Sequence, residues 1–184
     1  MLTEERKNEI MRRIEEIVSN NKELEEPAFD IVKFLKEKES FAIASKPMAD
    51  DTTGMLFVDD EEYISDTDTH RLIVINSLLK EQPNFVQRRR FIIAHEYAHY
   101  ILHKHNTKQY AHRDTSQKDT NEEIEADFFA RSLLMPQKVI NIILDLSFVK
   151  ELSTENRIAL IARFFNVTKK KAKQRLEEDL CCNV

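Results

Sequence analysis

The spacing of apolar residues along this 184-residue chain predicts a mostly helical protein. Apolar side chains recur three and four positions apart in residues 4–20 and again after Pro27, which is the pattern of amphipathic helices, and Pro27 is predicted to open the second of them. The same spacing predicts further helices at residues 85–103, 121–134, 136–146, 154–164 and 169–180. Asn84 can cap the helix that begins at residue 85, and Pro136 suits the first turn of a helix.

Short apolar runs predict a small sheet ahead of the helix at 85–103. Bounded and partly β-branched runs occupy residues 41–44, 55–58 and 71–76, with Tyr63-Ile64 as a further candidate strand. Residues 45–54 and 104–119 are polar and rich in turn-forming residues, so we expect loops there. The predicted fold class is therefore α+β, mostly helical, with a three- or four-stranded sheet packed on the helix at 85–103.

The length of the chain suits one ordinary domain, and we expect a single domain over residues 1–184. Its parts would be N-terminal helices in 1–40, a core with the sheet and the long helix in 41–136, and C-terminal helices in 137–184. Glycine occurs once, at Gly54, which favours helices over a sheet sandwich with many tight turns.

Composition limits the possible binding partners and the cellular compartment of the protein. A formal net charge of -5 argues against a dedicated nucleic-acid binder. The chain contains no apolar run near the roughly 18 residues that span a membrane. Its two cysteines, Cys181 and Cys182, are adjacent and cannot form a disulfide framework, so we expect a cytoplasmic protein.

The segment from His95 to His99 carries the strongest chemical signal, an H-E-x-x-H motif within an apolar predicted helix. Residues four apart lie on one helix face, so both imidazoles can reach one ion. Zinc binds neutral imidazole nitrogen, and catalytic zinc sites keep one coordination position for water. Glu96 can face that water and act as its general base.

Catalytic zinc normally has three protein ligands, so the motif needs one more. Glu123, in the next predicted helix, can supply a carboxylate, and Asp127 on the same helical face can accept the second N–H of a ligating histidine. The competing third ligand is His105, ten residues after His95. A histidine there needs glycine where Leu102 stands, because the chain must leave the helix sharply, and the spacing therefore favours Glu123.

Structural roles compete with these functional ones. Thr120 and Glu123 fit a capping box, in which the Glu123 carboxylate bonds back to the helix start. We interpret Glu125 as a first-turn acid favoured by the helix dipole, and His103 as a solvated residue at a helix end. Tyr110, His112 and Arg113 are candidates for stabilising an oxyanion, but a solvated loop is the favoured interpretation of that segment.

Two groups of residues together resemble the ImmA/IrrE family of zinc metallopeptidases. The first runs from Arg90 to His103, and the second from Glu123 to Ala130 and on to Leu133-Leu134-Met135-Pro136. Ile73-Val74-Ile75-Asn76 is similar to the family's strand before the motif helix, and Phe165-Asn166-Val167-Thr168 to its C-terminal element. The resemblance covers roughly residues 70–176. Many relatives carry Asn where Asp127 stands, which leaves open whether Glu123 or Asp127 is the inner ligand.

The resemblance implies a gluzincin-like core that binds Zn²⁺ and acts in the cytoplasm on a regulatory protein. Such substrates are commonly helix-turn-helix repressors of a mobile element or a stress response. We therefore expect a zinc metallopeptidase that cleaves a peptide bond in such a repressor. One alternative is a zinc-binding regulatory protein without turnover. Another is a DNA-binding regulator that uses the helices in 154–180, although a helical hairpin packed on the core is the favoured interpretation there.

Overall fold

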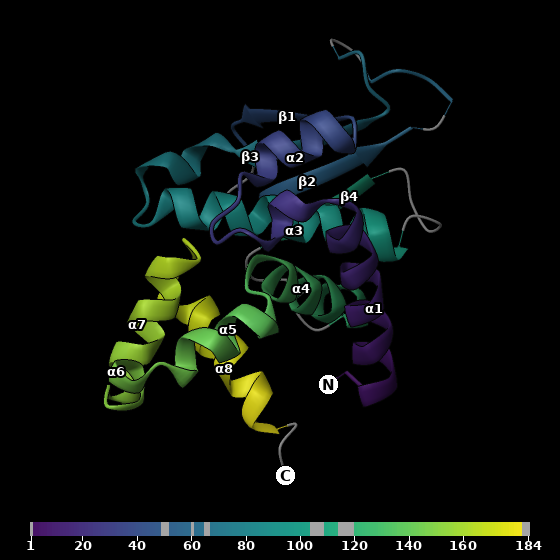
Figure 1. Cartoon of the computed structure of the whole chain (residues 1–184). Coiled ribbons are helices and arrows are strands. Elements are labelled where there is room, and N and C mark those ends of the chain that lie inside the picture. Colours follow the sequence, from purple (N-terminus) through teal and green to yellow (C-terminus); the bar gives the residue numbers. More distant parts are fainter. Residues whose placement is uncertain are drawn as a thin grey trace.

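A computed structural model describes residues 2–48, 52–59, 61–64, 67–103, 109–113 and 120–181, with the backbone alone for 109–113 and 179–181. A small sheet lies on one side of the long helix α3 (Phe85–His103), and helix α4 (Asn121–Leu134) lies on the other (Figure 1). The protein is mostly helical with a small mixed sheet, as the α+β prediction requires. That residues 1–184 form a single domain with these three parts remains a prediction.

The sheet has the strand order β1-β3-β2-β4. Its strands are β1 (Phe41–Lys46), β2 (Thr52–Val58), β3 (Arg71–Asn76) and β4 (Gln109–Arg113). Strand β1 pairs in parallel with β3, and β2 runs antiparallel to both β3 and β4. Ile43 and Leu56 both lie opposite Ile73, and Leu56 and Ile73 are buried in the core. The apolar runs therefore predicted the three strands that build the core.

Helix α3 is buried on all sides over its central turns, because the sheet covers one face and α4 covers another. This explains why its sequence is apolar almost all round instead of showing one apolar stripe. The chain enters α3 through Asn84, which has a left-handed backbone (φ 58) and accepts the N–H of Arg88 at its carbonyl oxygen. In α4, Phe128, Phe129, Leu133 and Leu134 are buried as core residues.

The N-terminal segment forms α1 (Glu4–Asn20), a 3-10 turn at Lys22–Glu25, and α2 (Ile31–Lys38). Helix α1 packs against α4, and α2 packs against β1 and α3. The prediction that Pro27 opens the second helix was wrong, because Ala28 takes a left-handed conformation (φ 54) and turns the chain. Asp30 begins α2 instead, and its side chain accepts the N–H groups of Val32 and Lys33.

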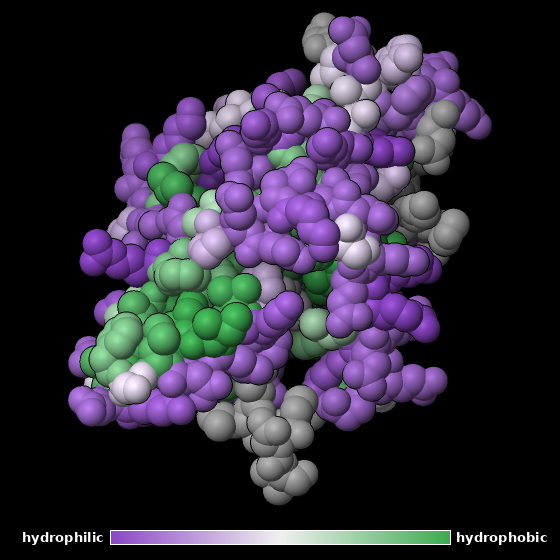
Figure 2. All heavy atoms as spheres, viewed as in Figure 1, coloured by the Kyte–Doolittle hydropathy of each residue, from purple (hydrophilic) through white to green (hydrophobic). Residues whose placement is uncertain are grey.

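The C-terminal segment folds into α5 (Gln137–Asp145), a short α6 (Ser147–Lys150), α7 (Thr154–Phe164) and α8 (Lys169–Cys181). Helices α7 and α8 form a hairpin that packs on α4 through α8. Figure 2 shows a largely apolar area over α5, α6 and α7. The large exposed hydrophobic residues of these helices and their connections are Ile142, Leu146, Phe148 and Phe164. Within the described residues, no helix combines the length and apolar character needed to cross a membrane.

Three local predictions were wrong. Residues 45–54, expected to form a loop, contribute Ser45 and Lys46 to β1 and their last residues to β2. The loop expected at 104–119 contains β4, whose pairing with β2 no apolar run had indicated. Tyr63 is 67% exposed, and the described segment 61–64 contains no strand. In each case strand pairing, or its absence, overrides the local sequence pattern.

Candidate metal centre

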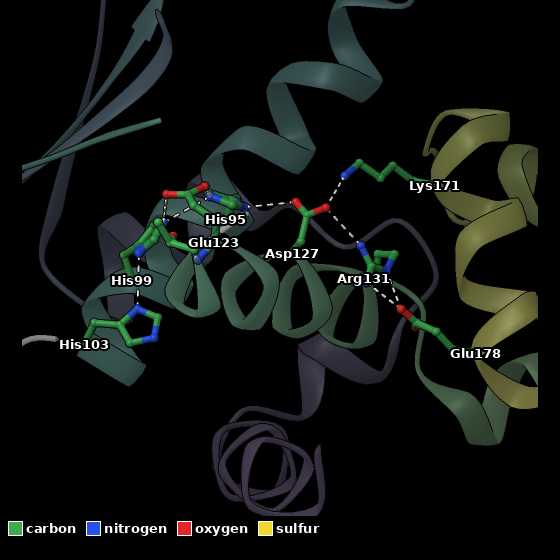
Figure 3. A network of polar contacts seen from close by, with 9 residues as sticks. His95, His99, His103, Glu123, Asp127, Arg131, Lys171 and Glu178 are labelled. Atoms are coloured by element: carbon green, nitrogen blue, oxygen red, sulfur yellow. Dashed lines mark hydrogen bonds and ion pairs between the residues drawn. The ribbon is translucent and has the colours of Figure 1, made fainter. Parts of the chain in front are cut away.

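Helices α3 and α4 bring three polar side chains together at their contact, as Figure 3 shows. His95 and His99 lie one turn apart on α3, and Glu123 points at both from the first turn of α4. The Nε2 atoms of the two histidines are 3.1 Å apart. Glu123 lies 3.1 Å from His95 Nε2 and 3.3 Å from His99 Nε2, through different carboxylate oxygens. These groups could hold a metal ion, and their candidate ligand atoms all lie within 4.8 Å of one another.

The spacing of these atoms fits a tetrahedral metal ion. Ligands at about 2.0–2.1 Å from zinc in tetrahedral geometry are separated from one another by about 3.3 Å. The three observed separations, 3.1, 3.1 and 3.3 Å, are close to that edge length. Two imidazoles and a carboxylate also match the ligand types of catalytic zinc sites. The residues present therefore fit the metal that the sequence predicts.

Asp127 orients His95 from the next turn of α4. Its Oδ1 lies 3.2 Å from His95 Nδ1, so an Nδ1–H can donate to it and leave Nε2 with a lone pair. Burial alone would raise the pKa of Asp127, but the His95 contact and the charges of Lys171 and Arg131 hold it well below its usual range. Burial alone would also lower the pKa of His95, but hydrogen bonds to Asp127 and Glu123 raise it to about 9.

The cations that hold Asp127 come from two helices. Arg131 lies one turn along α4, with Nη1 3.1 Å from Asp127 Oδ2, and it also pairs with Glu178 of α8. Lys171, at the start of α8, places Nζ 2.8 Å from the same oxygen and over the ring of Phe91. One lysine of the basic cluster at the start of α8, Lys169-Lys170-Lys171, therefore points into the protein, which fits a hairpin packed on the core.

His99 has a different set of neighbours. Its Nδ1 lies 3.2 Å from His103 Nδ1, and His103 Nε2 lies 3.0 Å from a carboxylate oxygen of Glu125. Burial lowers the pKa of His99 to about 4, although the Glu123 carboxylate opposes the shift. His103 ends α3 as expected, but the expectation that it is solvated was wrong, because it is only 7% exposed. Glu125, expected to be a first-turn acid favoured by the helix dipole, instead contacts His103 and Arg6. Buried polar groups are usually hydrogen-bonded, and these buried groups are hydrogen-bonded to one another.

Glu96 follows His95 in α3 and lies one residue further round the helix, where strand β2 packs. Its side chain is fully buried, and both carboxylate oxygens lack a hydrogen-bond partner within the described part of the chain. Burial raises the pKa of Glu96 to about 8, with Glu123 adding to the shift and His95 opposing it. Strand β2 comes very close here: a Cβ on Gly54 would lie 2.9 Å from Glu96 Oε1 and 2.5 Å from Ile92 Cγ2. The single glycine of the chain is what permits this approach.

Other predicted candidates lie beyond what the structure describes. His105, the rival third ligand, falls outside the described residues. Tyr110, His112 and Arg113 belong to β4, where the backbone alone is described, so their predicted roles remain predictions. The capping interpretation of Glu123 applies to its backbone, because Thr120 Oγ1 accepts its N–H while its carboxylate faces the histidines.

A peptidase family model described as the IrrE N-terminal-like domain matches residues 40–177. This chain belongs to the ImmA/IrrE family of metallopeptidases. Membership in the ImmA/IrrE family supports peptidase activity, and a peptidase implies a protein substrate. No curated protein is significantly similar to the chain in sequence. The matched segment includes α3 and α4 but begins after α1 and α2.

Proposed function

We propose that this protein is a zinc-dependent metallopeptidase in which His95, His99 and Glu123 bind the zinc ion and Glu96 is the general base. The observation that supports this most strongly is the close triangle of two imidazole nitrogens and a carboxylate beside a buried, unpartnered glutamate. Asp127 takes the outer role: it accepts the second N–H of His95 and leaves the inner position to Glu123.

When bound, zinc supplies a Lewis acid that lowers the pKa of water and polarises the scissile carbonyl. Glu96 accepts the proton of the attacking water at a carboxylate oxygen and delivers it to the leaving amine. A buried position with no competing hydrogen bond suits this role, because the carboxylate is available to the water. A zinc ion held by His95, His99 and Glu123 would favour the ionised form of Glu96.

The substrate we propose is a regulatory protein in the cytoplasm, specifically a helix-turn-helix repressor of a mobile element or a stress response. This part rests on family membership, which implies a protein substrate, and on the residues that resemble the family. Nucleic acid is not the expected partner, since the formal net charge is -5 and Lys171 in the basic cluster contacts Asp127.

Cleavage of a neighbouring gene product tests the proposal. The protein is incubated with the helix-turn-helix protein encoded nearest its own gene, with and without a chelator, and with zinc added back. We expect cleavage that the chelator stops and that zinc restores. Binding without cleavage under all three conditions would favour the regulatory protein without turnover. Equal cleavage in the presence of the chelator would overturn the metal-dependent mechanism.

A further inference from the structure

A continuous series of polar contacts leads from His99 to the N-terminal helix. His99 Nδ1 lies 3.2 Å from His103 Nδ1, and His103 Nε2 lies 3.0 Å from Glu125 Oε2. Arg6 of α1 reaches the same oxygen of Glu125, with Nη2 at 2.6 Å. His103 and Glu125 are largely shielded from water, with side chains 6% and 12% exposed. Three elements, α3, α4 and α1, therefore contribute to one chain of contacts.

The tautomer of His99 determines which atoms donate and which accept in this series of contacts. If His99 Nε2 faces a metal ion, its proton is on Nδ1, and this Nδ1–H donates to His103 Nδ1. His103 must then accept at Nδ1 and carry its own proton on Nε2, which donates to the Glu125 carboxylate. Arg6 keeps Glu125 in its ionised, accepting form, because a guanidinium beside a carboxylate favours the charged state. Each ring N–H in this series thus has an acceptor.

Arg6, at the end of this series of contacts, lies far in sequence from the other members. Arg6 and Glu125 are 119 residues apart, and α1 lies wholly outside the segment 40–177 that matches the family model. In the described structure, Arg6 is the one arginine or lysine within ion-pair distance of Glu125, whereas Asp127, the carboxylate beside His95, has two such partners. The support for His99 therefore depends on a helix that the family model does not include.

We propose that Arg6, Glu125 and His103 are positioning residues that fix the ring orientation and tautomer of His99, so that α1 is a working part of the metal centre. The inference rests on the proposed function, since it takes His99 as a metal ligand. It goes further by assigning roles to residues outside the motif and by making metal affinity depend on how α1 docks.

Zinc affinity, measured by competition with a chromophoric chelator, tests this assignment without any substrate. Loss of an outer hydrogen-bond partner typically lowers metal affinity about 10–100-fold. We expect a loss in that range for His103→Phe, and about tenfold for Arg6→Ala, which acts through two further residues. Arg6→Lys keeps the charge and should recover part of the loss. His103→Gln can both accept and donate, and it should recover more than His103→Phe.

Two substitutions on α1 serve as matched controls. Glu9→Ala removes the second ion pair of Arg6 but leaves its contact with Glu125. Arg13→Ala removes an exposed arginine of the same helix. Both should leave zinc affinity unchanged. Thermal unfolding of the metal-free variants separates a purely structural effect, which would lower the melting temperature of Arg6→Ala without changing its zinc affinity and would overturn the proposal.

Nitrogen-15 spectra of the histidine rings give an independent test on the unsubstituted, zinc-loaded protein. We expect His99 to carry its proton on Nδ1 and His103 to be the neutral tautomer with its proton on Nε2. A proton on His103 Nδ1 would overturn the proposal. If the unsubstituted protein does not bind zinc, the proposed function itself fails. If the unsubstituted protein binds zinc normally and the His103 and Arg6 variants bind it equally well, only the proposed role of Arg6, Glu125 and His103 fails.

Discussion

The two sides of helix α3 treat their buried polar groups in opposite ways. Toward α4, His95 and His99 each have a polar contact at both ring nitrogens, with partners that include Asp127 and His103. Toward β2, Glu96 is equally buried, yet both of its oxygens lack a partner within the described residues. Leaving such a group unpaired typically costs about 1–3 kcal/mol.

The difference distinguishes residues whose side-chain orientation is fixed by hydrogen bonds from a residue that is proposed to act on a reacting molecule. The partnered side needs fixed ring orientations, and its hydrogen bonds provide them. The unpartnered side retains a costly carboxylate, which is the pattern expected of a group whose partner is a reacting molecule. A substitution on one side of α3 therefore tests whether the other side responds.

The largest expected effect is loss of cleavage in Glu96→Gln. The amide keeps the size of the side chain but cannot take a proton from water, and general-base catalysis typically contributes about 10²–10⁴-fold. We expect cleavage to fall at least about hundredfold on that scale. Zinc affinity should stay close to that of the unsubstituted protein, because His95, His99 and Glu123 are unchanged. Glu15→Gln, an exposed matched control on α1, should cleave normally. Full activity in Glu96→Gln would refute the assigned base.

The pH dependence of zinc binding probes the partnered side. Contacts with Asp127 and Glu123 raise the pKa of His95 to about 9, so its ring carries a proton at pH 7 that zinc must displace. Affinity should therefore rise about tenfold per pH unit between pH 7 and 9 and level off above pH 9. The pKa of His99 is lowered to about 4, so His99 adds no slope there. Titrations of Glu96→Gln at several pH values isolate the contribution of His95.

Asp127→Asn sharpens the same measurement. The amide oxygen can still accept from His95 Nδ1, but the negative charge that favours the protonated ring is gone. The pKa of His95 should fall, so the affinity curve should become shallower and level off at a lower pH. An unchanged slope in this variant would show that Asp127 does not control the protonation of His95.

A smaller effect is expected where β2 touches Glu96. In Gly54→Ala, the new methyl group would lie 2.5 Å from Ile92 Cγ2 and 2.9 Å from Glu96 Oε1, so one of them must move. Overpacking of this kind typically costs about 1–3 kcal/mol of stability. Displacing the base should lower cleavage about tenfold, since small misplacements of catalytic groups are costly. Zinc affinity should be nearly unchanged, and an equal loss of affinity and cleavage would contradict a local effect on Glu96.

The smallest effect concerns stability and has the opposite sign. Glu96→Met removes a buried, unpartnered carboxyl and leaves a flexible apolar side chain of similar length. The metal-free protein should become more stable to urea by about 1 kcal/mol, because the unpaired polar group no longer has to be buried. Glu123→Met on the partnered side should lower stability instead, because His95 and His99 lose an acceptor. A destabilised Glu96→Met would remove the contrast between the two sides.

The sequence predicted the parts of this site that lie at fixed helical spacing. His95 and His99 are four apart, as are Glu123 and Asp127, so helix geometry alone brings each pair to one face. Their meeting across α3 and α4 could be expected because both helices flank one polar segment. That the spacing assigns the metal ligands correctly stays a prediction until the metal is measured.

The missing parts depend on contacts between distant segments. Nothing in the sequence around Arg6 or Lys171 indicates that they hold Glu125 and Asp127, since only tertiary packing brings these helices together. Gly54 looked like a loop residue because glycine and its neighbours favour turns, whereas pairing with Ile75 places it in a strand. An isolated glycine beside a strand pattern is the one local sign of a close approach.

X-ray absorption of the zinc-loaded protein at the zinc edge tests the central claim most directly. We predict one ion per chain with two imidazole nitrogens and carboxylate or water oxygens at about 2.0–2.1 Å, and the loss of one imidazole in His99→Ala. A third imidazole would point to a ligand such as His105, and a sulfur ligand would point to the cysteines. Either result, or the absence of bound zinc, would contradict the site formed by His95, His99 and Glu123.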